Sequence, residues 1–245
     1  MQEQDLAVII LAAGKGSRMQ TNLAKVLIPI AEKPILEYVL DVTEELHPNR
    51  TIVVVGHQAD QVQENFSDRG LEFVLQEEQL GTGHAARKTE QALNDFKGNI
   101  LVLCGDMPLI KAETLERLLL EHKKVAAKCS VLTLKSKGKH DFGRIIRHSD
   151  GSVLRIVEHR DASAQEKIVD EFNSGVYCFD KNLFFKALCC LSDDNVQKEY
   201  YLTDTLEYAM KNGYPVASVQ TEDTDEIFGI NSPEDLKRAE NLLEN

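Results

Sequence analysis

Three short apolar runs, each followed by a segment with helical periodicity, constrain the fold of this chain more than any other feature. The runs are Leu6–Ala12, Thr51–Val55 and Asn99–Leu103, and no charged residue interrupts them. Continuous apolar runs of this length are typical of strands buried on both faces of a sheet. Because such strands alternate with helices along the chain, right-handed crossovers and a mostly parallel sheet are predicted.

The segments between the runs carry helix signals. Pro34 opens a predicted helix in which residues 35, 36, 39, 40 and 43 form one stripe. The same periodicity predicts helices over 59–66 and 84–96, and a helix that carries Leu115, Leu118 and Leu119. A further strand is predicted over 71–75.

The second half of the chain has a different pattern. Strands predicted at 143–147 and 153–158 flank an Asp-Gly pair, which indicates an antiparallel hairpin. We interpret this antiparallel middle as a lobe appended to one compact domain. The other predicted elements are strands at 172–179 and 216–220 and helices at 181–191, 204–212 and 233–243, the last capped by Ser232.

The charge balance narrows the range of partners. The chain has 28 Lys and Arg against 40 Asp and Glu, a net charge of −12. Because sequence-independent nucleic-acid binding needs a basic surface, no nucleic acid is expected. No apolar run reaches the roughly 18 residues of a membrane helix, and the N-terminus lacks the basic region of a secretory signal. Five cysteines without a C-x-x-C pair favour a reducing, cytoplasmic location.

A glycine loop, Gly14-Lys15-Gly16-Ser17-Arg18-Met19, follows the first apolar run. Such loops often expose backbone N–H groups to an anion. The loop is not a P-loop, which needs the pattern G-x-x-x-x-G-K-[ST], and it is not a dinucleotide fingerprint, because Met19 stands where the third glycine of G-x-G-x-x-G should be. It carries cations instead, and Ala12 and Ala13 before it leave room for a flat base. A structural turn with solvated cations is the alternative at this point.

The longer string LAAGKGSRM, from Leu11 to Met19, extends into a family pattern. With later blocks in the same order up to Asn231, it resembles the N-terminal uridyltransferase domain of bacterial N-acetylglucosamine-1-phosphate uridyltransferase, a sugar-nucleotide pyrophosphorylase. These blocks are AKVL at 24–27, Gln76, LGTGHA at 80–85, GDMPL at 105–109, FGRI at 142–145, IVE at 156–158, FNSG at 172–175, EYYLTD at 199–204 and GIN at 229–231.

The resemblance implies a doubly wound, mostly parallel Rossmann-like sheet of the nucleotide-diphospho-sugar transferase type, with a small antiparallel sugar-binding lobe. Residues 1–245 would form one nucleotidyltransferase domain. Its nucleotide-binding part would cover about 1–135 and its sugar-binding lobe about 136–230, before the C-terminal helix. The hexapeptide repeats of a β-helix acetyltransferase domain are missing, so acetyl transfer is not predicted. The chain is then a monofunctional enzyme or part of a longer protein.

The resemblance also implies the reaction. UTP and N-acetylglucosamine 1-phosphate would give UDP-N-acetylglucosamine and pyrophosphate. The attacking phosphate needs no general base, because its second pKa is about 6. Arg18 and Lys25 would be catalytic and contact phosphate oxygens. Asp106 and Asn231 would hold Mg²⁺, which prefers hard oxygen ligands.

The other site residues are also carried over from the family. Gln76, whose amide is both donor and acceptor, would bind the base edge. The departures lie beside these positions: Cys104 and Phe142 stand where an aromatic residue and a tyrosine are common, and Asp141 and Lys135–His140 also differ. The implied nucleotide-binding residues are Leu11, Ala12, Ala13, Gly14, Lys15, Gln76, Gly81, Thr82 and Gly105, and the implied sugar-binding residues are Gly143, Glu158, Asn173, Tyr201 and Thr203.

Two alternatives stay open at this point. The chain is a nucleotidyltransferase for another sugar 1-phosphate or for dTTP, or it is a non-catalytic module that binds sugar nucleotides, since fold alone does not establish function. Magnesium-dependent turnover separates these two. The sequence does not predict the oligomeric state.

Overall fold

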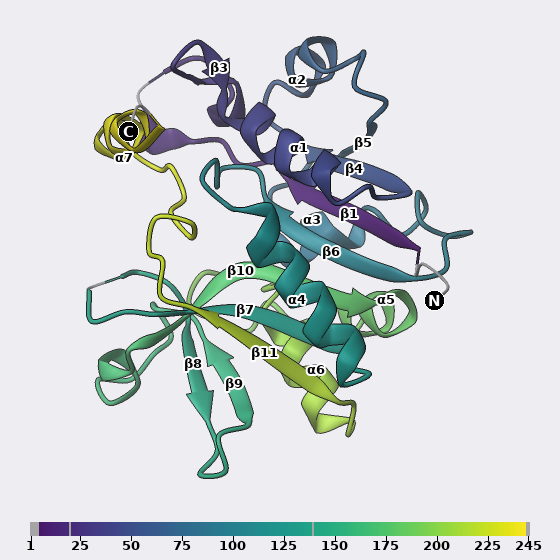
Figure 1. Cartoon of the computed structure of the whole chain (residues 1–245), viewed down its shortest axis with the longest axis vertical. Coiled ribbons are helices and arrows are strands. Elements are labelled where there is room, and N and C mark those ends of the chain that lie inside the picture. The colour runs from purple at the N-terminus through teal and green to yellow at the C-terminus, as the bar shows by residue number, and fades with distance from the viewer. Residues whose placement is uncertain (1–4, 20, 139, 244–245) are drawn as a thin grey trace.

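The computed structural model describes residues 5–19, 21–138 and 140–243 (Figure 1). Residues 1–4 of the predicted non-secretory N-terminus lie outside these ranges, as does Lys139 in the Lys135–His140 stretch. Among the helices described, none has the length and apolar character needed to cross a membrane.

A nine-stranded sheet forms the centre of the described fold. Its parallel part has the order β6-β1-β4-β5, and beyond β6 the sheet continues with β10, β7 and β11. β10 runs antiparallel to both of its neighbours, whereas β11 is parallel to β7. These strands are β1 (Leu6–Leu11), β4 (Arg50–Val55), β5 (Glu72–Leu75), β6 (Asn99–Cys104), β7 (Cys129–Lys135), β10 (Glu171–Asp180) and β11 (Val216–Thr221).

Helices cover both faces of this sheet, because alternate residues of each apolar strand point to opposite faces. Val8 and Ile10 belong to one hydrophobic core, and Ala7 and Ile9 belong to the other. The first core is closed by α1 (Ile35–Glu45), α2 (Ala59–Asn65) and α4 (Ala112–Lys124). The second is closed by α3 (Thr82–Arg87), α5 (Lys181–Leu188) and α6 (Asp204–Lys211). The predicted doubly wound α/β fold is therefore confirmed.

The predicted hairpin forms from β8 (Arg144–Arg147) and β9 (Val153–Val157). Gly151 turns the chain between them at φ +88°, a conformation that glycine adopts without strain. β8 pairs with β10 at Phe172–Arg144, so the hairpin extends the main sheet. A separate two-stranded sheet forms from β2 (Pro29–Ile30) and β3 (Lys33–Pro34).

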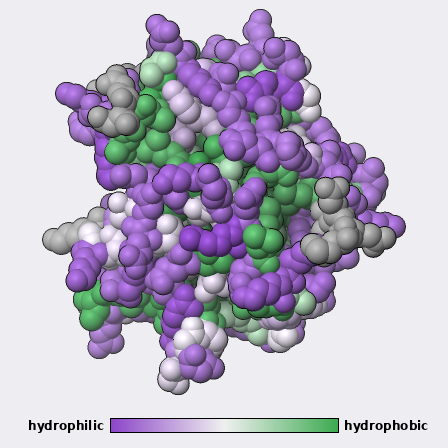
Figure 2. Space-filling model, in the orientation of Figure 1, coloured by the Kyte–Doolittle hydropathy of each residue, from purple (hydrophilic) through white to green (hydrophobic). Residues whose placement is uncertain are grey.

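The last helix, α7 (Pro233–Leu243), lies beside β2, from which it is far along the chain (Figure 1). Ser232 Oγ accepts a hydrogen bond from the Asp235 backbone N–H at 3.2 Å, as predicted for its cap. Ile230 and Ala239 pack with Ile30 and Ile35 in a third small core. Figure 2 shows that the face carrying α4 and α7 is mostly hydrophilic, as expected when helices turn their apolar stripes inward.

Two helices end earlier than predicted, and the strands β2, β3 and β7 were not predicted. The helix predicted over 84–96 is wrong beyond Arg87, where α3 ends and turns continue to residue 95. Thr89 Oγ1 donates to the Ala86 carbonyl, a local bond that competes with the helix ladder, yet Leu93 and Phe96 still reach the core. The helix predicted over 181–191 ends at Leu188. Strand β7 was not predicted, because Ser130 and Thr133 interrupt its apolar run although both are buried.

Candidate active site

A cavity of about 280 Å³ lies at the carboxyl ends of β1 and β6. Open parallel sheets bind ligands at this edge. Most of its lining comes from the loop after β1, the segment after β6 and the segment that enters α3. The lining residues are Leu11, Ala12, Ala13, Gly14, Lys25, Val26, Gln76, Gln79, Gly81, Thr82, Ala85, Cys104, Asp106 and Glu199.

The glycine loop packs closely against Lys25. Gly16 has φ +59°, and a Cβ atom at this position would lie 2.7 Å from the Cβ of Lys25. Only glycine fits there without a shift of one segment. Gly105 N–H donates to the Leu11 carbonyl at 2.9 Å. The two strand-end segments are therefore joined directly behind the cavity.

Four polar side chains from distant parts of the chain meet beside the cavity, and we call Arg18, Lys25, Asp106 and Asn231 the strand-end group. The Lys25 ammonium forms an ion pair with Asp106 and donates to Asn231 Oδ1 at 3.2 Å. Arg18 donates to the same Oδ1 at 3.0 Å. The Lys25 and Asp106 side chains are 12% and 21% exposed, so a ligand in the cavity can reach a partly desolvated pair of opposite charges.

The strand-end group fits a hard divalent cation. A carboxylate oxygen of Asp106 and the amide oxygen of Asn231 both contact one ammonium group, so both oxygens face a single cation. Asn231 Nδ2 donates to the Gly229 carbonyl at 3.1 Å, which turns the amide oxygen toward that point. Mg²⁺ is usually held by one or two oxygen atoms of the protein, and phosphates and water complete its coordination.

Gln76 lines the cavity and is 3% exposed. Its Nε2 donates to the Gly81 carbonyl at 3.2 Å and lies 3.0 Å from Nδ1 of His84. Burial, then the cations Lys88 and Arg87, lower the pKa of His84. A neutral His84 can accept this bond and orient the amide, although the sequence indicated only a structural histidine.

The segment around Gly81 is tied to the segment around Tyr200. Gly81 has φ +106°, and a Cβ atom there would lie 2.7 Å from the Tyr200 carbonyl oxygen. Tyr200 N–H donates to the Leu80 carbonyl at 2.8 Å, and Leu202 N–H donates to Thr82 Oγ1 at 3.1 Å. The LGTG and EYYLT blocks therefore form one wall, although Thr82 and Leu202 are 120 residues apart in the sequence.

The predicted sugar-binding residues gather between β8, β9 and β10. A Cβ atom on Gly143 would lie 3.5 Å from Glu158 Oε1 and from Asn173 Cβ, and Thr203 Oγ1 donates to Glu158 at 3.2 Å. Asn173 Oδ1 accepts from the Tyr177 hydroxyl at 2.8 Å and from Gly175 N–H at 3.1 Å. Its Nδ2 has no acceptor among the described residues, so Asn173 can offer a ligand only a donor.

The predicted sugar-binding residues form a second wall, which is rich in carboxylates. Burial raises the pKa of Glu158, against the lowering effect of the Thr203 hydrogen bond. Burial, together with Glu207 and Asp161, raises the pKa of Asp204 to about 6. The Tyr201 hydroxyl donates to Asp161 at 3.2 Å, and burial is the main reason that its pKa rises to about 12.

Not every predicted residue lines the cavity. Lys15 and Arg18 are exposed outside its lining, although Arg18 contacts Asn231, and Gly105 is buried. Asn231 and the five predicted sugar-binding residues also lie outside this lining. Sequence reasoning missed Gln79, which carries no signal except its position between Gln76 and Gly81. Burial raises the pKa of Cys104 to about 12, which keeps its thiol neutral and agrees with the prediction that it is not a nucleophile.

A mostly parallel sheet that presents cations, a carboxylate and an amide beside one strand-end cavity has the features of a site for phosphorylated ligands. The chain belongs to the family described as MobA-like NTP transferase domain, whose model matches residues 8–198. This family assignment makes the domain a nucleotidyltransferase domain.

Curated relatives match nearly the whole chain. The bifunctional protein GlmU of Bacillus licheniformis is 43% identical over 232 residues, which are 95% of this chain and 51% of that protein. The bifunctional protein GlmU of Bacillus cereus is 45% identical over 237 residues, 97% of this chain and 51% of that protein. The chain spans about half the length of these relatives. The matches confirm the resemblance to the N-terminal uridyltransferase domain.

A solved structure supports the fold. The crystal structure of a UDP-glucose pyrophosphorylase complexed with UDP-glucose superposes with a TM-score of 0.79 and covers 98% of both chains. At 18% sequence identity, this likeness concerns the fold alone.

Proposed function

We propose that this chain transfers the uridylyl group of UTP to N-acetylglucosamine 1-phosphate, which forms UDP-N-acetylglucosamine and releases pyrophosphate. The observation that carries this proposal is the strand-end group beside the cavity. Its two cations and two hard oxygen ligands converge next to the loop after β1, where a triphosphate would lie. The relatives named GlmU and the family blocks support it.

The chemistry requires one bond to form and one to break. A phosphate oxygen of the sugar 1-phosphate attacks the α-phosphorus of UTP, and the bond from that phosphorus to the bridging oxygen of pyrophosphate breaks. The bonding electron pair leaves with pyrophosphate. No proton moves, because the attacking phosphate is mostly ionised near pH 7. Positioning and charge neutralisation then supply the catalysis.

Arg18 and Lys25 would neutralise phosphate oxygens in this step. Both already lie next to the amide oxygen of Asn231, and Lys25 is largely shielded from water. Fixed cations in a partly dry site stabilise developing charge more strongly than solvated ones. Asp106 and Asn231 would hold Mg²⁺, which when bound neutralises charge on the phosphates.

Two groups of residues would select the two substrates of the reaction, one in the cavity and one between β8, β9 and β10. Gln76, oriented by His84, and the backbone at Gly81 would bind the uracil edge, while Thr82 and residues 11–15 would line the nucleotide. Glu158 would accept hydrogen bonds from sugar hydroxyls and Asn173 Nδ2 would donate one. Gly143, Tyr201 and Thr203 would complete the sugar wall.

The deciding experiment measures pyrophosphate release with Mg²⁺ across a panel of nucleoside triphosphates and sugar 1-phosphates. We expect the fastest turnover with UTP and N-acetylglucosamine 1-phosphate, and its loss in Asp106→Ala. Faster turnover with dTTP or with another sugar would keep the reaction and reject the substrate assignment. Folded protein that binds UTP without turnover of any pair would instead indicate a binding module.

A further inference from the structure

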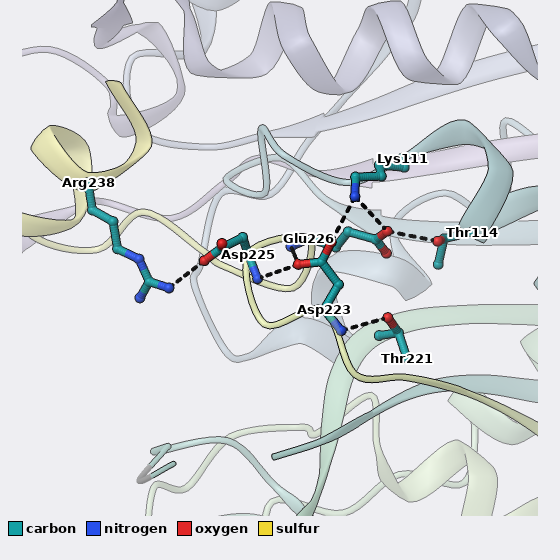
Figure 3. A network of polar contacts seen from close by, with 7 residues as sticks. All are labelled: Lys111, Thr114, Thr221, Asp223, Asp225, Glu226 and Arg238. Carbon is teal, nitrogen blue, oxygen red and sulfur yellow. Dashed lines mark hydrogen bonds and ion pairs between the residues drawn. The ribbon is translucent and has the colours of Figure 1, made fainter. Parts of the chain in front are cut away.

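A polar network lies where the chain leaves β11, beside the beginning of α4. Lys111 extends from the beginning of α4 toward Asp223 and Glu226 (Figure 3). Lys111 Nζ lies 2.7 Å from Asp223 Oδ2 and 3.4 Å from Glu226 Oε1, which also accepts from Thr114 Oγ1 at 3.0 Å. Asp223 Oδ1 accepts from the N–H groups of Asp225 and Glu226.

Glu226 is an unusual member of this network. It is 5% exposed, and its Oε2 has no hydrogen-bond partner among the described residues. A buried carboxylate costs free energy unless its partners compensate it. The bonds to Thr114 and Lys111 therefore hold Glu226 against α4. Neither the chemistry of the strand-end group nor the family blocks use this residue.

The network connects two segments that both lead to the strand-end group. Lys111 follows Asp106 by five residues on one segment, and Glu226 precedes Asn231 by five residues on the other. Near the cavity the same two segments meet again, since Ile230 N–H donates to the Asp106 carbonyl at 2.9 Å. Between these two attachments, Ile227 is buried in the core that contains Leu115. The two segments are thus joined at both ends.

We propose that Glu226 is a positioning residue, which by anchoring its segment to Thr114 and Lys111 sets the place of Asn231 relative to Asp106. This role rests on the proposed function, because it matters for catalysis only if these two side chains hold the metal and face the phosphates. Arg238, on α7, pairs with Asp225 and holds the same segment from its other side (Figure 3).

The first test is hydrogen exchange, which does not depend on turnover. In Glu226→Ala, peptides covering residues 227–232 should exchange about tenfold faster than in the wild type, because the Ile230–Asp106 bond opens more often. Glu226→Gln retains the Oε1 acceptor and should stay within about twofold of the wild type. Lys124→Ala, at the far end of α4 where Lys124 pairs with Glu121, is the matched control and should leave these peptides unchanged.

The second test is Mn²⁺ binding in the presence of UTP, followed by electron paramagnetic resonance, together with the metal dependence of turnover. Glu226→Ala should raise the Mn²⁺ concentration for half-saturation about tenfold. It should have no further effect in an Asn231→Ala background, because it acts through Asn231. Lys111→Ala should raise the same Mn²⁺ concentration by a smaller factor. Because the Lys111 side chain is half-exposed, this variant should fold even if Glu226→Ala does not.

Wild-type exchange at 227–232 in Glu226→Ala would overturn the proposal, and so would an effect on metal binding that simply adds to that of Asn231→Ala. If the wild type does not turn over UTP with any sugar phosphate, the proposed function fails. The exchange measurement then decides alone whether Glu226 anchors its segment.

Discussion

The candidate site has two walls, the strand-end group and the wall that carries Glu158 and Asp204, and the two differ in whether their charged side chains are paired. In the strand-end group, opposite charges lie in contact, and Lys25 pairs with Asp106. On the wall formed by β9 and the segment before α6, Glu158 and Asp204 have no cation within ion-pair distance among the described residues. Their pKa values are raised by burial.

This difference corresponds to the ligand groups that each wall would meet. Phosphates and a divalent metal bring large charges of both signs, so a wall that meets them needs groups of both signs. Sugar hydroxyls bring none, and a partly buried carboxylate accepts strong hydrogen bonds from them. Changes to the first wall should therefore act on the rate of the chemical step, whereas changes to the second should act on sugar affinity.

The largest expected effect comes from Lys25→Ala, which should lower kcat by about 10²–10³-fold, the usual loss when one group that stabilises the transition state is removed. Steady-state pyrophosphate release measures it, and urea unfolding checks the fold. The matched control is Lys97→Ala, at an exposed lysine distant from the cavity lining, which should leave kcat unchanged. A fall in kcat that only follows lost stability would contradict a catalytic role.

Arg18→Ala should have a smaller effect, about 10–10²-fold on kcat/KM, because Arg18 is exposed and water partly screens its charge. The loss should grow smaller at high ionic strength, where screening already weakens the wild type. Arg18→Lys keeps the charge and should recover part of the activity. Equal activity of Arg18→Ala and the wild type at low salt would remove Arg18 from the mechanism.

Glu158→Gln tests the other wall. We expect the KM for the sugar 1-phosphate to rise about tenfold, the equivalent of one charge-assisted hydrogen bond, with little change in the KM for UTP. Initial rates at varied concentrations of each substrate measure both values. Thr203→Val, which removes only the hydroxyl that donates to Glu158, should produce a smaller rise. A fall in kcat at unchanged KM would show that the two walls do not divide the work in this way.

The smallest effect concerns stability. The pKa of Asp204 is about 6 in the fold against an ordinary 3.8. Its contribution to the free energy of unfolding is therefore fully present below pH 3.8, and it is lost as the pH rises through about 6. Asp204→Asn should therefore stabilise the protein at pH 7.5 relative to pH 4. We expect about 1 kcal/mol, or a Tm higher by about 2–4 °C, because the N-terminus of α6 partly favours the charge. Calorimetry at both pH values measures it, and an equal Tm difference at both would contradict the raised pKa.

Much of the fold could be predicted from the sequence, because buried strands and capped helices carry local patterns. The stripe at Ile35, Leu36 and Val39 is fully buried, and the Asp-Gly pair turns the predicted hairpin. Strand β7 escaped prediction because its polar residues are buried by contacts with other elements of the fold. Its Ser130, for example, bonds to His122 on α4, a contact that no local pattern indicates.

The candidate site shows the same limit. The residues of the strand-end group could be selected by resemblance, yet the direct contact between Lys25, Asp106 and Asn231 depends on three-dimensional packing. His84 and Glu226 were not given roles, since each acts through a neighbour and neither carries a chemical motif of its own. Residues that position others are visible only once their contacts are known.

The antiparallel strand β10 has a consequence for the order in which the protein can assemble. Asn99 of β6 pairs with Asp180, and Cys129 of β7 pairs with Phe179. During synthesis, the chain up to the end of β7 therefore leaves the ribosome with two strand edges that have no native partner on that side. Open strand edges invite pairing with other chains, so a nascent chain stalled before residue 171 is the species most exposed to aggregation. These two edges are joined only when β10, which lies between β6 and β7, has been synthesised.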